Sequence, residues 1–200
     1  MTAVILALVA YLIGSVSFAV VVSRALSLPD PRSYGSRNPG ATNVLRTGKK
    51  PAAVLTLLGD CAKGTVAVLI ASRFAEAHAL ELAMGAAAFA VVLGHVFPVF
   101  FGFRGGKGVS TALGVLLGLD VYVALGAAAT WIIVAVFFRI SSLAALVSAL
   151  FAPFAALLLY NPGHPFFVSI CAISALLVWR HKSNIRNLIS GTESRLGRGS

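Results

Sequence analysis

The feature that most limits how this chain can fold is a run of 40 residues, 140–179, without a charged side chain. A membrane-spanning helix needs about 20 consecutive apolar residues, so the run is long enough for two helices. The chain has 200 residues, of which 58% are hydrophobic and 11% charged, whereas a soluble domain carries about 25% charged residues. This composition excludes a soluble enzyme and a disordered chain. It predicts an all-α, polytopic membrane protein with a single domain over 1–200.

A turn signal at 161–165, with two prolines and a glycine, divides this run into two spans. Five apolar stretches precede it. The stretch 50–73 is interrupted by Asp60 and Lys63, and 108–119 is only 12 residues long, so it is either a short span or a re-entrant segment. We predict seven transmembrane helices, at about 1–23, 50–73, 82–103, 108–119, 121–138, 141–160 and 165–182.

The positions of Lys and Arg predict how these helices are oriented. With the N-terminus outside, the inner segments 24–50, 101–107, 139–141 and 180–200 hold 14 of the 16 basic residues, and the outer segments hold only Arg73. Cytoplasmic loops of membrane proteins carry the excess of basic residues, so we expect the C-terminus in the cytoplasm. The net charge of +10 then belongs to a cytoplasmic face beside the lipid bilayer and implies no nucleic acid partner.

The first inner loop, 25–50, is long for a connection between two spans. Asn38 followed by proline is typical of a helix N-cap, and it predicts a short helix through 40–46 whose free N–H groups suit an anion. The guanidinium of Arg46 adds a planar fork that fits phosphate or carboxylate. The alternative is a solvated basic loop. The candidate binding residues of this loop are Ser36, Asn38, Thr42, Asn43 and Arg46.

The second inner loop, 102–108, places glycines around Lys107 just before an apolar helix. Glycines let the backbone approach an anion closely, and the following helix directs its N-terminus to the same place. The loop is not a nucleotide-binding Walker A motif, which would need glycine at Phe101 and Ser or Thr at 108. The alternative is a flexible turn. The candidate residues are Gly105, Gly106, Lys107 and Gly108.

The third polar segment follows the last span. At helical spacing His181 and Asn184 lie one turn apart on the same face, just beyond the expected membrane boundary. The alternative is an amphipathic helix whose cations reach lipid headgroups. His95 lies near the inner end of the third span, where it is either a structural histidine or part of the site.

The ionisable pair in the second span is costly to bury, so such residues are usually paired or functional. Asp60 and Lys63 are spaced to neutralise each other, which leaves two readings open: a packing role, or a path for a proton or ion. No Cys, His or acidic cluster has metal-ligand spacing, and no familiar nucleophile motif is present. Any chemistry would depend on positive charge, N–H groups and hydroxyls, which suits a substrate that carries its own leaving group, such as a phosphate.

Three strings together resemble the bacterial membrane glycerol-3-phosphate acyltransferases that use acyl phosphate, the PlsY family. They are GSRNPGATNVLR at 35–46, GHVFPVFFGFRGGKGVSTALG at 94–114, and HKSNI at 181–185, with Leu188, Gly191 and Glu193 after it. The resemblance implies a seven-helix enzyme of the bacterial inner membrane with its site on the cytoplasmic side. It would transfer a fatty acyl group from acyl phosphate to the sn-1 hydroxyl of glycerol 3-phosphate, using no cofactor, acyl-CoA or metal. A soluble acyl-phosphate-forming enzyme is an implied partner.

Carried over by motif position, the resemblance implies two groups of site residues. One group would hold glycerol 3-phosphate: Ser36, Arg46, Lys107, His181 and Asn184. The other would hold the acyl phosphate: Thr42, Asn43, the backbone of Gly105 and Gly106, and Ser142. Asn38, Gly108 and His95 complete the set of candidates.

The general base stays open between His181 and a phosphate oxygen of the acyl donor, and we favour the phosphate. Two rival functions remain at this point. A transporter of a phosphorylated solute would also need basic inner loops, although no inverted repeat is visible. A membrane scaffold would tolerate replacement of Lys107 and Arg46.

Overall fold

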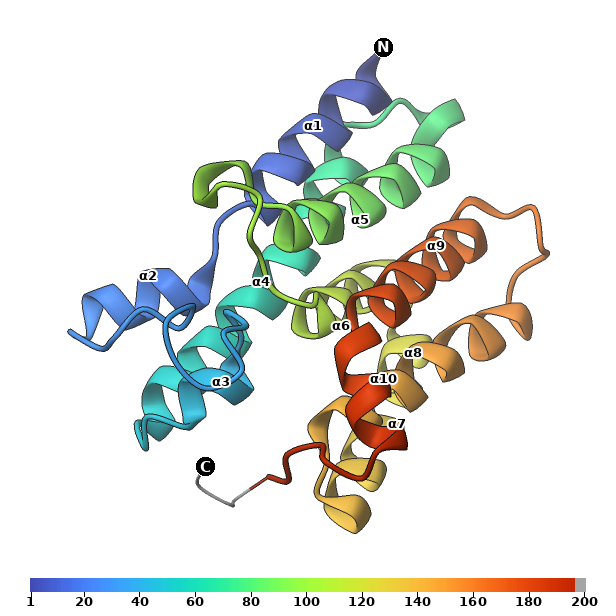
Figure 1. Ribbon diagram of the computed structural model, residues 1–200. Helices are drawn as coiled ribbons and strands as arrows, with labels where there is room; N and C mark the ends of the chain where they lie inside the picture. The colour runs from blue at the N-terminus through green and yellow to red at the C-terminus, as the bar shows by residue number, and fades with distance from the viewer. Residues whose placement is uncertain (197–200) are drawn as a thin grey trace.

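The computed structural model describes residues 1–196, and within that range all regular structure is helical (Figure 1). The prediction of an all-α chain is therefore confirmed. The α-helices are α1 (Thr2–Gly14), α2 (Phe18–Ala25), α3 (Ala41–Leu45), α4 (Lys50–Phe74), α5 (Leu80–Val96), α6 (Val109–Leu119), α7 (Val121–Phe138), α8 (Ser141–Leu157), α9 (Pro165–Arg180) and α10 (Lys182–Ile189). Two short 3₁₀ turns, η1 (Ala77–Ala79) and η2 (Val99–Phe101), flank α5.

Each of the seven predicted spans contains a helix, and one local prediction, the N-cap at Asn38, is wrong. The first range is broken between α1 and α2 at 15–17, and the last helix ends at Arg180, where α9 and α10 meet at a bend of 58°. The helix expected at 40–46 is capped by Gly40 and covers five residues, so Asn38 is not its N-cap. Gly40 has an extended backbone, φ −156° and ψ 163°, and the helix begins two residues later than Pro39 at its first position would place it.

Within residues 1–196, four helical segments are by length and composition long and apolar enough to cross a membrane, or five if α9 and α10 form one bent span. The helices α6 and α8 are apolar but shorter. At 1.5 Å per residue, the 11 residues of α6 extend about 16 Å, roughly half of a hydrocarbon core. Surrounding helices shield α6 instead, because it contacts α4, α5, α7 and α9.

Close packing of α6 against α4 depends on two glycines that face each other across the helices. A β-carbon on Gly64 would overlap the backbone of Thr111, and one on Gly114 would overlap the backbone of Cys61. Small residues let helix backbones approach in this way in membrane proteins. The α1–α5 contact is built similarly, and Figure 1 shows these two helices side by side.

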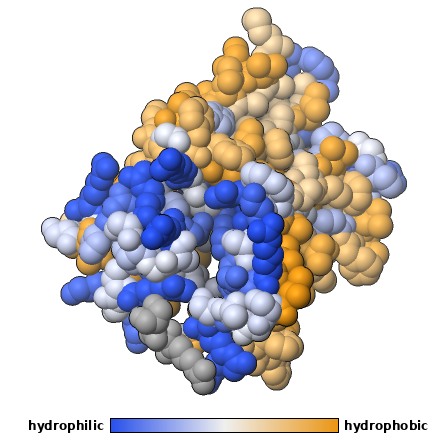
Figure 2. All heavy atoms as spheres, in the orientation of Figure 1, coloured by the Kyte–Doolittle hydropathy of each residue, from blue (hydrophilic) through white to orange (hydrophobic). Residues whose placement is uncertain are grey.

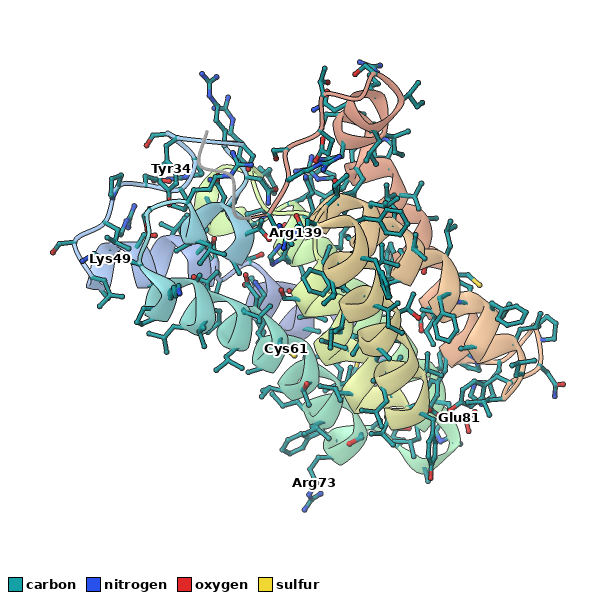
Figure 3. The ribbon with its side chains drawn as sticks, turned by 90° about the horizontal axis from the view of Figure 1, so that it is seen from below. Tyr34, Lys49, Cys61, Arg73, Glu81 and Arg139 are labelled. Atoms are coloured by element: carbon teal, nitrogen blue, oxygen red, sulfur yellow. The ribbon has the colours of Figure 1, made fainter. Side chains whose placement is uncertain are left out.

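The surface divides into an apolar part and a polar part (Figure 2). Large apolar side chains stand exposed along most helices, which a soluble protein avoids over so wide an area but a lipid-facing surface requires. Tyr34, Lys49 and Arg139 lie toward one end of the molecule and Arg73 and Glu81 toward the other (Figure 3). Lys49 and Arg139 from two of the basic segments thus lie toward the same end, and the orientation of the helices in a membrane stays a prediction.

Candidate active site

One cavity of about 950 Å³ connects the three polar segments with the interior of the helical bundle. Its polar end is formed by the 36–46 loop, the start of α6, α10 and the residues after α10. Its apolar walls come from α4, α6, α7, α8 and α9. The predicted site residues on its wall are Ser36, Asn38, Thr42, His95, Arg46, Lys107, Gly108, Ser142, His181 and Asn184. Segments far apart in the sequence therefore line one cavity.

Asn43 does not line the cavity, although we expected it to bind substrate. Its side chain is 2% exposed, donates to the carbonyl oxygens of Pro31 (2.7 Å) and Tyr34 (3.2 Å), and accepts from the Ser36 N–H (3.0 Å). Both amide hydrogens of Asn43 and one acceptor position of its oxygen are thereby used inside the loop. Asn43 holds the fold of the segment that carries Ser36 and Arg46.

Gly105 and Gly106 also lie off the cavity wall and pack against the C-terminal end of α5. The Gly106 N–H donates to the carbonyl oxygen of His95 (3.1 Å), and a β-carbon on Gly106 would overlap the His95 ring. Both glycine carbonyls accept from the guanidinium of Arg180 (3.2–3.3 Å). The glycines are needed for this close approach, and the Gly106 N–H that was expected to bind an anion is already paired.

Lys107 follows these glycines and reaches into the cavity, where its Nζ donates to Oδ1 of Asn184 (2.5 Å). Burial lowers the pKa of Lys107 to about 8, and the nearby guanidinium groups of Arg180 and Arg46 lower it too, while the Glu193 carboxylate opposes them. The ammonium group is thus predominantly protonated at pH 7 and sits among other cations. An anionic ligand placed beside it would relieve this repulsion.

His181 occupies the turn between α9 and α10 and is 2% exposed. Its Nδ1 lies 2.7 Å from the carbonyl oxygen of Leu177, and since a carbonyl only accepts, Nδ1 carries the hydrogen and Nε2 of the neutral ring is an acceptor. Burial lowers the pKa of His181 to about 4. The imidazole is therefore neutral near pH 7 and is a weak base.

The residues after α10 close over the polar end of the cavity and were not among our predicted site residues. Oε1 of Glu193 accepts from Ser142 Oγ (2.7 Å) and from Asn184 Nδ2 (2.7 Å). Arg46 Nη2 donates to Ser194 Oγ (2.8 Å). The segment therefore links the first polar loop, α10 and the start of α8. The sequence signal that could have identified this segment is Glu193, the one acidic residue in the basic stretch 180–200.

A buried charge cluster lies beneath the polar end. Lys63 Nζ lies 2.8 Å from Asp60 Oδ1 and donates to the carbonyl oxygen of Val16 (2.7 Å), between α1 and α2. His95 Nδ1 lies 3.5 Å from Asp60 Oδ1 and 3.1 Å from the Thr111 hydroxyl. The predicted pairing of Asp60 with Lys63 is confirmed, and the cluster joins four helical segments.

The arrangement can bind anionic groups at one end and an alkyl chain at the other. Arg46 and Lys107 supply positive charge, and the hydroxyls of Ser36 and Thr42 on the same wall supply neutral donors. Among residues 1–196, no three His, Cys, Asp or Glu side chains are grouped as metal ligands would be. The geometry fits an amphipathic anion whose head reacts at the cationic end.

Comparisons with known proteins agree with this geometry. Residues 4–191 match the profile of the family described as "Glycerol-3-phosphate acyltransferase". The chain is 58% identical over 198 residues to a glycerol-3-phosphate acyltransferase of Cupriavidus taiwanensis, with 98% of each chain covered. It is 60% identical over 193 residues to the Burkholderia cenocepacia protein of that name, covering 96% of this chain and 89% of the relative.

Two solved structures have a similar fold over nearly the whole chain. Both are of PlsY, described as an integral membrane glycerol 3-phosphate acyltransferase, one in the glycerol 3-phosphate form and one in the lysophosphatidic acid form. They superpose with TM-scores of 0.91 and 0.87 at 37% sequence identity, covering 98% of this chain and 96% of the other. With the family profile and the curated relatives, they show that this chain belongs to the PlsY family of membrane glycerol-3-phosphate acyltransferases.

Proposed function

We propose that this glycerol-3-phosphate acyltransferase takes its acyl group from acyl phosphate and transfers it to the sn-1 hydroxyl of glycerol 3-phosphate. The products are lysophosphatidic acid and phosphate, and neither acyl-CoA nor a metal takes part. The observation that carries the proposal is the continuity of one cavity between a cationic end and an apolar interior. Both substrates are anions, and one of them carries a long alkyl chain.

We assign the phosphate of glycerol 3-phosphate to the side chains that converge from the three polar segments. These are Ser36, Arg46, Lys107 and Asn184; His181, whose Nε2 only accepts, is assigned to a hydroxyl of the same substrate. The charge and donors of this group suit a phosphate, and its members lie on one cavity wall. Thr42, Ser142, Asn38 and Gly108 lie on the same wall and are assigned to the acyl phosphate head. We give Asn43, Gly105 and Gly106 an indirect role, since they shape the loops that carry Ser36 and Lys107.

In the proposed reaction the sn-1 oxygen attacks the carbonyl carbon of the acyl phosphate. The new ester C–O bond forms, the bond from the carbonyl carbon to the phosphate oxygen breaks, and phosphate leaves. Positive charge from Lys107 and Arg46 stabilises the oxyanion and the leaving group. A phosphate oxygen of the donor accepts the hydroxyl proton, because His181, with a pKa of about 4, is a weak base near pH 7. His181 then positions the substrate through Nε2.

We further propose that all seven apolar segments cross or fill the inner membrane of a bacterium, with the N-terminus outside and the site facing the cytoplasm. In this topology α1 and α2 form one broken span, and the short α6 is enclosed by its neighbours. The excess of basic residues in the four inner segments supports this orientation. A soluble enzyme that makes acyl phosphate would then deliver the donor from the cytoplasmic side.

The test supplies the purified protein with labelled glycerol 3-phosphate and either palmitoyl phosphate or palmitoyl-CoA, with no added metal. We expect lysophosphatidic acid from the phosphate donor alone. Product from palmitoyl-CoA alone would show that acyl phosphate is not the donor. If a folded sample gave no product with either donor but moved labelled solute across vesicles, the transporter reading would replace ours. Full activity after Lys107→Met would favour a scaffold role for this segment.

A further inference from the structure

The inner part of the cavity is a closed apolar space between α7, α8 and α9. Ala127, Ala149, Ala152 and Ile170 line it, and we call these four residues the alanine pocket. Their exposed fractions are 4%, 6%, 5% and 1%, so the space they surround lies inside the bundle and not on its lipid-facing surface. An empty space of this kind destabilises a packed core, because its walls lose their contacts.

The depth of this pocket follows from the geometry of α8. Ser142 lies at the polar end, where it donates to Glu193, and Ala152 lies ten residues further along the helix. At 1.5 Å per residue this distance is about 15 Å. Ala156, one turn beyond, is fully buried and is not part of the wall. The pocket therefore ends between Ala152 and Ala156.

An extended alkyl chain fits this space. Carbon–carbon bonds of about 1.5 Å at angles near 111° advance about 1.25 Å per carbon, so about 15 Å takes roughly 12 carbons. The cavity also opens sideways between α4 and α7, where Val54, Leu57 and Ile132 line it and are 51%, 44% and 56% exposed. An acyl chain from the bilayer can enter through this opening. Its far end can then lie either in the alanine pocket or in the side opening between α4 and α7.

We propose that the alanine pocket holds the distal part of the acyl chain, and that Ala152 at its closed end determines which chain length the enzyme prefers. This inference rests on the proposed function and deepens it. Alanines on the facing sides of α7 and α8 leave a space that larger side chains would fill. A helix interface built to pack tightly would not keep such a space, whereas a binding site for an alkyl group needs it.

The test uses competition among saturated acyl phosphates of 8, 10, 12, 14 and 16 carbons, with labelled glycerol 3-phosphate and mass analysis of the products. Ala152→Leu moves the end of the pocket back by about one helical turn, which is roughly four carbons. We expect the preferred chain to shorten by that amount. We also expect the ratio of kcat/KM for 16 carbons to that for 8 carbons to fall at least tenfold, since one excess methylene costs about that factor.

Two further variants keep the test decisive. Ile170→Ala enlarges the same pocket and should shift the preference toward longer chains, which a general loss of stability would not do. Ala129→Leu makes the same substitution at an exposed position on α7 that is not on the cavity wall, and it should leave the profile unchanged. If Ala152→Leu is poorly folded, Ala152→Val replaces it, with a smaller shift in the same direction.

The proposal is overturned if active Ala152 and Ile170 variants keep the wild-type chain profile, because the chain then leaves through the side opening. This failure differs from failure of the proposed function. If the wild-type enzyme used no acyl phosphate but did use acyl-CoA, the donor would be wrong. The same chain series run with acyl-CoA would still measure the effect of the alanine pocket.

Discussion

The buried pair of Asp60 and Lys63 allows a quantitative prediction. Both side chains are 3% exposed, and the Asp60 Oδ1 and Lys63 Nζ atoms are 2.8 Å apart in the middle of α4. Each has a second neighbour: Lys63 donates to the Val16 carbonyl oxygen, and Asp60 lies 3.5 Å from His95 Nδ1. We compare Asp60→Leu, Lys63→Met and the double variant with the wild-type protein.

Removal of one partner leaves a buried charge without its counter-ion, which costs about 3–5 kcal/mol of stability. Removal of both leaves no unpaired charge, but the Val16 carbonyl oxygen loses its donor, which costs about 1–3 kcal/mol. Independent effects of the two substitutions would add to about 6–10 kcal/mol. We therefore expect the double variant to be more stable than either single variant.

The measurement is the free energy of unfolding in mixed micelles, followed by tryptophan fluorescence. The exposed pair of Asp30 and Arg32, 36% and 31% exposed with a 2.7 Å contact, serves as the control. Its disruption should change stability by no more than about 1 kcal/mol. Additive effects of Asp60→Leu and Lys63→Met would refute the reasoning. Single variants as stable as the wild type but inactive would instead support a proton or ion path through this pair.

Three further predictions concern the polar end of the cavity. If protonated Lys107 binds the substrate phosphate, kcat/KM for glycerol 3-phosphate should fall as the pH rises through the Lys107 pKa of about 8 in the free enzyme. Arginine stays protonated, so Lys107→Arg should remove this fall up to pH 9. Glu193→Gln removes the charge that raises the pKa of Lys107, so it should move the alkaline fall to lower pH; an unchanged profile would count against this coupling. Gly106→Ala forces the loop away from the His95 ring, and a displacement near 1 Å should lower kcat/KM about 100-fold. Gly163→Ala is the control and should retain near-wild-type activity, because a β-carbon there would meet no atom within 4 Å and the backbone φ is not positive. Activity assays at fixed lipid composition test all three.

The all-helical fold, and the meeting of the polar strings at one cavity, could be predicted from the sequence because both depend on local composition. Uncharged runs predicted where helices form, and Lys and Arg between them predicted one basic end. The three polar strings had to meet at that end if the helices were antiparallel, and ten predicted residues do line one cavity. Uncertainty remained at breaks such as 15–17 and at the cap of α3, where small local energies determine the exact boundary.

The tertiary structure alone decided what each polar group contacts. Asn43 and Lys107 are both polar residues in basic loops, yet Asn43 turns inward to hold its loop and Lys107 reaches the cavity. Glu193 gained its place from contacts with Ser142 and Asn184, of which Ser142 is 51 residues away in the chain. Residue type and spacing determine which groups can bind or carry charge. Their partners depend on which helix surfaces pack together, and that is set by side-chain shape across the whole bundle.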